Sequence, residues 1–146
     1  MWDTVFSAAN VLAMVGWAVL IFAPRRELPM TAVLYLGVAL LCLVYSVGLV
    51  AIMTGLADPA GPSGGVDFSS IEGVQQIFGS RGGVTVGWVH YLALDLFAGL
   101  WIARDADAKG FSRWIQAPVL AATFMAGPLG LFVWLMVRET RRKRRA

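Results

Sequence analysis

The stretch VGWVHYLALDLFAGLWIARDA, residues 86–106, decides the fold of this chain, because it is long and apolar enough to cross a bilayer as a helix. It nevertheless contains the only histidine of the sequence, His90, and a carboxylate, Asp95. A charged side chain deep in a membrane is costly, so such residues usually face other helices or a cavity. The stretch therefore predicts a membrane helix with a polar site along it.

The composition of the whole chain also indicates a membrane protein. Of the 146 residues, 58% are hydrophobic and 14% are charged, whereas a soluble domain has about 25% charged residues. The length leaves room for one small membrane domain, without a separate soluble enzyme domain. The basic tail at the C-terminus, which includes RETRRKRRA, is typical of a segment that lies on anionic lipid headgroups rather than on nucleic acid.

Four apolar runs are each long enough to form a spanning helix, which needs about 20 residues. They cover residues 4–23, 31–53, 84–103 and 114–137, and a basic tail follows at 138–146. Backbone groups inside a bilayer must bond within their own segment, so each run is expected to be helical. The sequence thus predicts an all-α, integral membrane four-helix bundle in one domain, 1–146. We expect a multi-pass protein of a bacterial inner membrane, in which dimerisation is plausible.

The connection between the second and third spans, residues 54–83, is expected to contain one short helix. Its second half, DFSSIEGVQQIFGS, places Ile71, Val74 and Ile77 at helical spacing. Ser69 and Glu72 have the spacing of a capping box. We therefore expect an amphipathic helix on the membrane surface, with a loop that merely touches lipid as the alternative.

The basic residues do not fix the orientation of a four-span chain. With four spans, both termini and the 54–83 connection lie on one side, which carries Arg81 and the six basic residues of the tail. The other side carries five basic residues: Arg25, Arg26, Arg104, Lys109 and Arg113. Because positive charges near spans favour the cytoplasm, the tail slightly favours cytoplasmic termini. An odd number of spans would remove the conflict.

Asp95 and His90 are the candidate catalytic residues, since they are the polar groups within the third span that could transfer a proton. Five residues at about 100° each place them roughly 140° apart around the helix, so they do not share one stripe. Asp95 could instead tie helices together as a structural group. No second histidine or cysteine lies at ligand spacing, so no metal site is predicted.

Five further residues are candidates for lining a substrate site. Trp88, Tyr91 and Gly99 follow the stripe of the carboxylate, and Phe97 follows that of the histidine. Pro128 lies inside the fourth apolar run, where it is expected to kink the helix and open a cavity. Ordinary packing is the alternative for each of these residues.

Several segments together resemble a known family: APRREL (23–28), IEGVQQIF (71–78), GWVHYLALDLFAGLWIARDA (87–106) and GPLG (127–130). They are similar to the abscisic-acid-deficient-four-like membrane proteins of plants and bacteria, which have four spans and are related to neoxanthin synthesis. The resemblance extends over residues 20–136. Its most specific part is the pattern W-x-H-x-x-x-x-D-L-F, formed here by Trp88, His90, Asp95, Leu96 and Phe97.

The resemblance implies a carotenoid or a related apolar isoprenoid as the ligand. In plants the family is linked to the conversion of violaxanthin to neoxanthin, an epoxide-to-allene isomerisation that needs no redox cofactor. Such a reaction needs an acid for the epoxide oxygen and a base for a proton on the adjacent polyene carbon. Asp95 is the expected acid, with His90 as base or hydrogen-bond partner. The alternative is a non-catalytic carotenoid- or lipid-binding protein, or a structural subunit of a larger membrane complex.

Overall fold

The computed structural model describes residues 1–58 and 67–142, and the side chains of 141 and 142 are left out of the description. Within these residues every regular element is a helix, which confirms the all-α class. In chain order the elements are α1 Trp2–Phe22, α2 Glu27–Ala32, the π-helix η1 Val33–Ala39, α3 Leu40–Met53, α4 Ile71–Ile77, α5 Arg81–Ala108, α6 Arg113–Met125 and α7 Gly127–Arg142.

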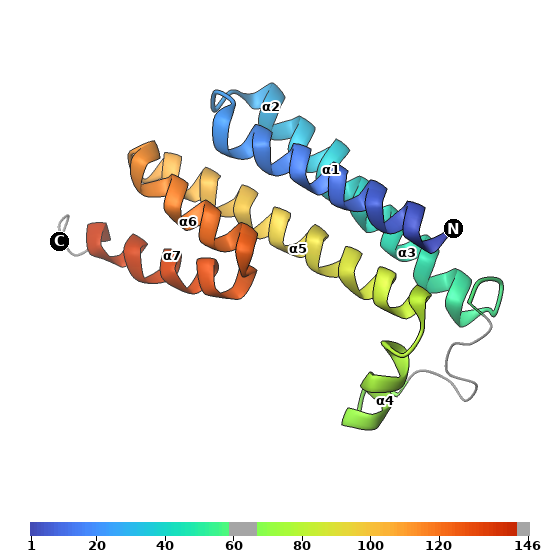
Figure 1. Cartoon of the computed structure of the whole chain (residues 1–146). Coiled ribbons are helices and arrows are strands. Elements are labelled where there is room, and N and C mark those ends of the chain that lie inside the picture. Colours follow the sequence, from blue (N-terminus) through green and yellow to red (C-terminus); the bar gives the residue numbers. More distant parts are fainter. Residues whose placement is uncertain (59–66, 143–146) are drawn as a thin grey trace.

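Three helices are long and apolar enough to span a membrane. They are α1, the continuous helix formed by α2, η1 and α3 (Glu27–Met53), and α5. α5 lies at the centre, because it packs against α1 and the Glu27–Met53 helix on one side and against α6 and α7 on the other (Figure 1). The first three predicted spans are therefore confirmed as helices, although the second begins at Glu27 and the third extends from Arg81 to Ala108.

Small residues let the neighbouring helices approach α5 closely. A Cβ on Gly16 of α1 would lie 2.8 Å from Leu96 of α5, and one on Gly37 would lie 3.0 Å from the same side chain. A Cβ on Gly48 would likewise lie 2.8 Å from the side chain of Val86. Glycine at such positions allows van der Waals packing between helices. Leu96 is consequently fully buried at the centre of the core.

The fourth predicted span is wrong as a single helix. The segment 114–137 is divided between α6 and α7, and the residue between them, Ala126, has a non-helical backbone (φ −155°, ψ 85°). α7 then folds back along α6, so the two form a hairpin (Figure 1). At about 1.5 Å per residue, α6 is about 20 Å and α7 about 24 Å long, less than the roughly 30 Å of a bilayer core.

The sequence AGPLG, residues 126–130, explains why the chain turns at this point. Pro128 is the second residue of α7, and the first turn of a helix tolerates proline because its N–H groups have no partner within the helix. Gly130 lies so close to α6 that a Cβ there would overlap the backbone of Thr123. The expected effect of Pro128 was a kink within one helix, whereas the structure has the start of a new helix that runs back.

The short helix in the connection, α4, occurs where it is expected, but its cap differs. Ser70 rather than Ser69 is the N-cap, and its hydroxyl oxygen accepts a hydrogen bond from the Gly73 N–H at 3.1 Å. Both serine hydroxyls donate to the carboxylate of Asp67. These hydrogen bonds, that of Ser69 first, lower the pKa of Asp67 to about 2.

Candidate functional site

Asp95 projects from the middle of α5 toward the break between α6 and α7. The backbone N–H of Gly127, the first residue of α7, donates a hydrogen bond to its carboxylate. A Cβ on Gly127 would overlap that carboxylate, so only glycine leaves room for it. Asp95 therefore accepts from a backbone N–H in the first turn of α7, as an N-cap side chain would, although it belongs to a different helix.

The half-buried carboxylate of Asp95 also lines a cavity of about 430 Å³. α1, α5 and the turn between α6 and α7 contribute the rest of the lining, which includes Trp88, Tyr91, Phe124 and Pro128. The lining is predominantly apolar and aromatic, as is usual for sites that bind small apolar molecules. Asp95 is the only carboxylate among the residues described as lining this cavity.

One polar partner in this cavity was not identified from the sequence. Asn10 of α1 lies in the lining, and its side-chain oxygen accepts a hydrogen bond from the indole N–H of Trp88 at 3.1 Å. Phe6 stacks on the same indole with a centroid distance of 6.1 Å. The position of the Trp88 ring is thus fixed from α1. The signal that could have revealed Asn10 is a lone amide in an apolar run.

His90 lies in a different cavity, between α3, α4 and α5. This second cavity has a volume of about 220 Å³, and Tyr45, Phe78 and Tyr91 are part of its lining. The ring of Tyr45 lies 5.2 Å from the imidazole. Tyr91 lines both cavities, whereas the structure does not bring His90 and Asp95 together in one.

The other predicted lining residues divide into two groups. Trp88, Tyr91 and Pro128 join Asp95 in its cavity. Phe97 lies half-exposed on the surface of α5, outside the linings of both cavities. Gly99 is a packing position, because a Cβ there would overlap the ring of Trp17.

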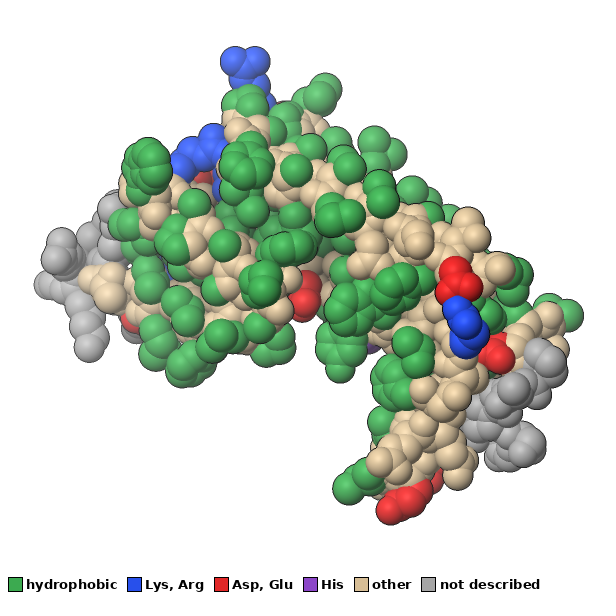
Figure 2. All heavy atoms as spheres, in the orientation of Figure 1, with side chains coloured by type: hydrophobic (Ala, Val, Ile, Leu, Met, Phe, Trp, Pro, Cys, Tyr) green, Lys and Arg blue, Asp and Glu red, His purple; other side chains and the backbone are tan. Residues whose placement is uncertain are grey.

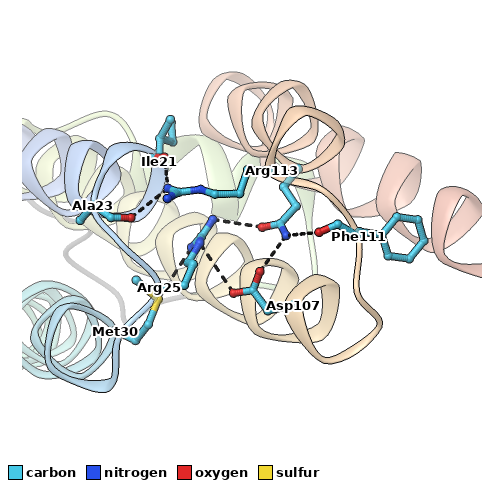
Figure 3. Close-up of polar contacts among 8 residues, drawn as sticks. Ile21, Ala23, Arg25, Met30, Asp107, Phe111 and Arg113 are labelled. Atoms are coloured by element: carbon cyan, nitrogen blue, oxygen red, sulfur yellow. Dashed lines mark hydrogen bonds and ion pairs between the residues drawn. The ribbon is translucent and has the colours of Figure 1, made fainter.

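A polar cluster at the far end of α5 was not predicted (Figure 3). The amide of Gln116, which is 1% exposed, donates to Asp107 at 2.7 Å and to the Phe111 carbonyl at 3.0 Å. Its oxygen accepts a hydrogen bond from Arg25 at 3.2 Å. Burial lowers the pKa of Arg25, while the neighbouring Asp107 raises it. Arg113 donates to the carbonyls of residues 21 and 23, so the cluster links the end of α1 to α5 and α6.

A second carboxylate at this end holds α7. Asp105 accepts a hydrogen bond from the indole N–H of the fully buried Trp134 at 3.0 Å. It also pairs with Lys109 at 2.6 Å and with Arg138 at 3.3 Å. The α6–α7 hairpin is thus attached to α5 twice, by Asp95 at its tip and by Asp105 toward its base.

Comparison with known proteins places the chain in a family. No curated protein and no solved structure matches it. Among the described residues, no group of three His, Cys, Asp or Glu side chains could hold a metal ion. The family model described as ABA DEFICIENT 4-like matches residues 4–134, nearly the whole chain. The protein therefore belongs to the ABA DEFICIENT 4-like family, as the resemblance implied.

Proposed function

We propose that the protein is an integral membrane protein that binds a carotenoid or a related apolar isoprenoid beside Asp95 and isomerises it by acid–base chemistry. Membership of the family relates the chain to neoxanthin and abscisic-acid biosynthesis. The observation that carries the proposal is Asp95 itself, a carboxylate in a predominantly apolar and aromatic cavity. Intramembrane carboxylates commonly mark a functional site.

The surface of the molecule supports a place in the membrane. Large hydrophobic side chains are exposed along α1, α3 and α5, and Figure 2 shows hydrophobic side chains spread over most of the visible face. An exposed apolar surface of this extent would be unfavourable in water but suits contact with lipid. An apolar substrate dissolved in the bilayer could reach the Asp95 cavity directly.

The reaction can be written with Asp95 alone. The protonated carboxyl group gives its proton to the epoxide oxygen, and the C–O bond to the polyene-side carbon breaks. The resulting carboxylate takes a proton from the adjacent polyene carbon, and the electrons of that C–H bond form the allene. The carboxyl group is restored and no electrons enter or leave, so no redox cofactor is needed.

In this proposal His90 contacts the ligand but does not take the proton. Since Tyr91 lines both cavities, a long ligand that crosses Tyr91 would meet Asp95 with one part and His90 with another. The imidazole could then bind a polar group away from the reacting epoxide. This arrangement fits an extended molecule better than a small one.

A second candidate function is supported by the hydrogen bond from Gly127 to Asp95. That bond satisfies a backbone N–H at the start of α7, which would otherwise be unpaired away from water. If this is the whole role of Asp95, the protein is a non-catalytic binding protein or a subunit of a membrane complex.

The experiment compares Asp95→Asn with Asp95→Ala in a bacterial host that accumulates epoxy-carotenoids. Asparagine keeps an oxygen that can accept from Gly127 but cannot supply the proton, whereas alanine removes both. Pigment profiles measure conversion, and thermal unfolding of the purified variants measures the fold.

Catalysis predicts that Asp95→Asn keeps the unfolding temperature but lowers conversion by about 10²–10⁴-fold, the usual contribution of a general acid. A purely structural role predicts the same pigment profile in Asp95→Asn as in the wild type, and a loss of about 1–2 kcal/mol of stability in Asp95→Ala, as for a deleted cap. If the wild-type protein yields no new isomer but co-purifies with pigment, the binding function replaces the catalytic one.

A further inference from the structure

The basic residues of the described chain lie almost entirely at one of its two ends. One end combines the α1–α2 turn, the α5–α6 turn and the end of α7, which lie together in Figure 1. Eight basic residues belong to it: Arg25, Arg26, Arg104, Lys109, Arg113, Arg138, Arg141 and Arg142. Four acidic residues lie at the same end: Glu27, Asp105, Asp107 and Glu139. We call these eight residues the basic end. In the sequence, Lys143, Arg144 and Arg145 follow directly.

The opposite end has far fewer basic residues. It contains the start of α1, the 54–58 segment, α4 and the start of α5. Its acidic residues are Asp3, Asp58, Asp67 and Glu72, and its one described basic residue, Arg81, forms an ion pair with Asp3. Basic residues are therefore as unevenly divided between the two ends as between the two sides of a membrane protein with a fixed orientation.

The α6–α7 hairpin is what gathers the positive charge at one end. In a four-span chain, the residues after 137 would lie on the side of α4, opposite to Arg25 and Arg113. Because α7 returns along α6, Arg138, Arg141 and Arg142 instead lie at the end where α6 began (Figure 1). The conflict that the sequence presented for four spans disappears with three spans and a hairpin.

We infer that the basic end faces the cytoplasm and lies on the anionic headgroups of the cytoplasmic leaflet, with α4 and the N-terminus on the opposite side of the membrane. α6 and α7 form a re-entrant hairpin that enters from the cytoplasmic side and turns beside Asp95. The inference rests on the membrane placement proposed above but not on the ligand or the reaction. Lys and Arg next to spanning helices both set orientation and bind anionic lipid.

Single-cysteine labelling tests this inference directly. Cys42 is exposed on α3 within a span, so the background is Cys42→Ala. The reporters are Gln75→Cys on α4, Ser112→Cys before α6 and Thr140→Cys near the end of α7, all at exposed positions. Intact cells of a bacterial host, with the outer membrane permeabilised, are treated with a membrane-impermeant maleimide. Treatment after full permeabilisation shows that each reporter can react, and Gln76→Cys replaces the α4 reporter if it cannot.

The expected pattern is labelling of Gln75→Cys in intact cells and of the other two reporters only after permeabilisation. A four-span chain would place the reporter at 140 with that at 75 and opposite to that at 112, which would overturn the inference. The reverse pattern, or labelling of every reporter in intact cells as well as after permeabilisation, would overturn the orientation. None of these results depends on pigment conversion, so this inference and the proposed function can fail separately.

The same variants test the contact with anionic lipid. The Thr140→Cys variant, labelled with a polarity-sensitive dye, is compared in phosphatidylcholine nanodiscs with and without phosphatidylglycerol, and the labelled Gln75→Cys variant is the matched control. We expect a spectral shift at position 140 that salt reverses, because salt screens exposed charges, and no shift at position 75. Equal shifts at both positions, or none at either, would exclude the headgroup contact.

Discussion

At the scale of single residues, the sequence revealed the ionisable groups within the third apolar run and missed the amides Asn10 and Gln116, which lie in the first and fourth runs. Asp95 could be identified because a carboxylate in a spanning helix has few explanations. Gln116 could not, because an amide four residues into a helix is common and its burial depends on three other segments. The separation of His90 from Asp95 was visible as an angle around α5, but which cavity each would face depended on the neighbouring helices.

Gln116→Leu tests whether the buried cluster stabilises the fold. The leucine fills a similar volume but cannot make the three hydrogen bonds of the buried amide, to Arg25, Asp107 and the Phe111 carbonyl. A hydrogen bond contributes about 0.5–1.5 kcal/mol, so a clear fall in thermal stability is expected, measured by tryptophan fluorescence in detergent. Gln75→Leu, at an exposed position on α4, is the control and should change little. Equal stability of the two variants would show that the cluster contributes nothing.

At the scale of the elements, helices were predictable and the turn between α6 and α7 was not. An apolar run must be helical in a membrane whether it spans or turns back, so the run 114–137 could not distinguish the two. The distinction lies in contacts between distant residues. Asp95 interacts with the backbone of Gly127 at the start of α7, and Gly130 allows α7 to pack closely against α6. Only the sequence AGPLG indicates an irregularity in this run, and Pro128 within it predicts a kink in one helix rather than a turn between two.

Gly130→Ala tests the close packing of the hairpin. Its methyl group would overlap the backbone of Thr123, which cannot move as a flexible side chain can. Overpacking of this kind costs about 1–3 kcal/mol, so the variant should unfold at a lower temperature. The matched control is Pro128→Ala, at an exposed position in the first turn of α7, where an effect within about 0.5 kcal/mol is expected. If the proline variant is the less stable of the two, the hairpin depends on the rigidity of Pro128 rather than on close approach at Gly130.

At the scale of the whole molecule, the number of spans decides how the charges are arranged. With four spans, the basic residues would lie on both sides of the membrane, which conflicts with the usual bias toward one side. The sequence alone does not show whether the number of spans or the charge bias is wrong. The hairpin resolves it, since α7 carries Arg138 back to the end where Arg25 and Arg113 already lie. A local break at Ala126 thus changes the topology of the entire chain.

The attachment of the hairpin to α5 at two points predicts how the molecule opens. Asp105→Ala removes the acceptor of the buried Trp134 indole and the ion-pair partner of Arg138, so α7 should detach locally before the rest unfolds. Trypsin cleavage after Arg138, followed by mass spectrometry under native conditions in detergent, should then become faster. Asp107→Ala is the matched control, because among the described side chains Asp107 bonds to Arg25 and Gln116 rather than to α7. Equal acceleration by both substitutions would mean that the far end of α5 opens as one unit, and that Asp105 does not specifically hold α7.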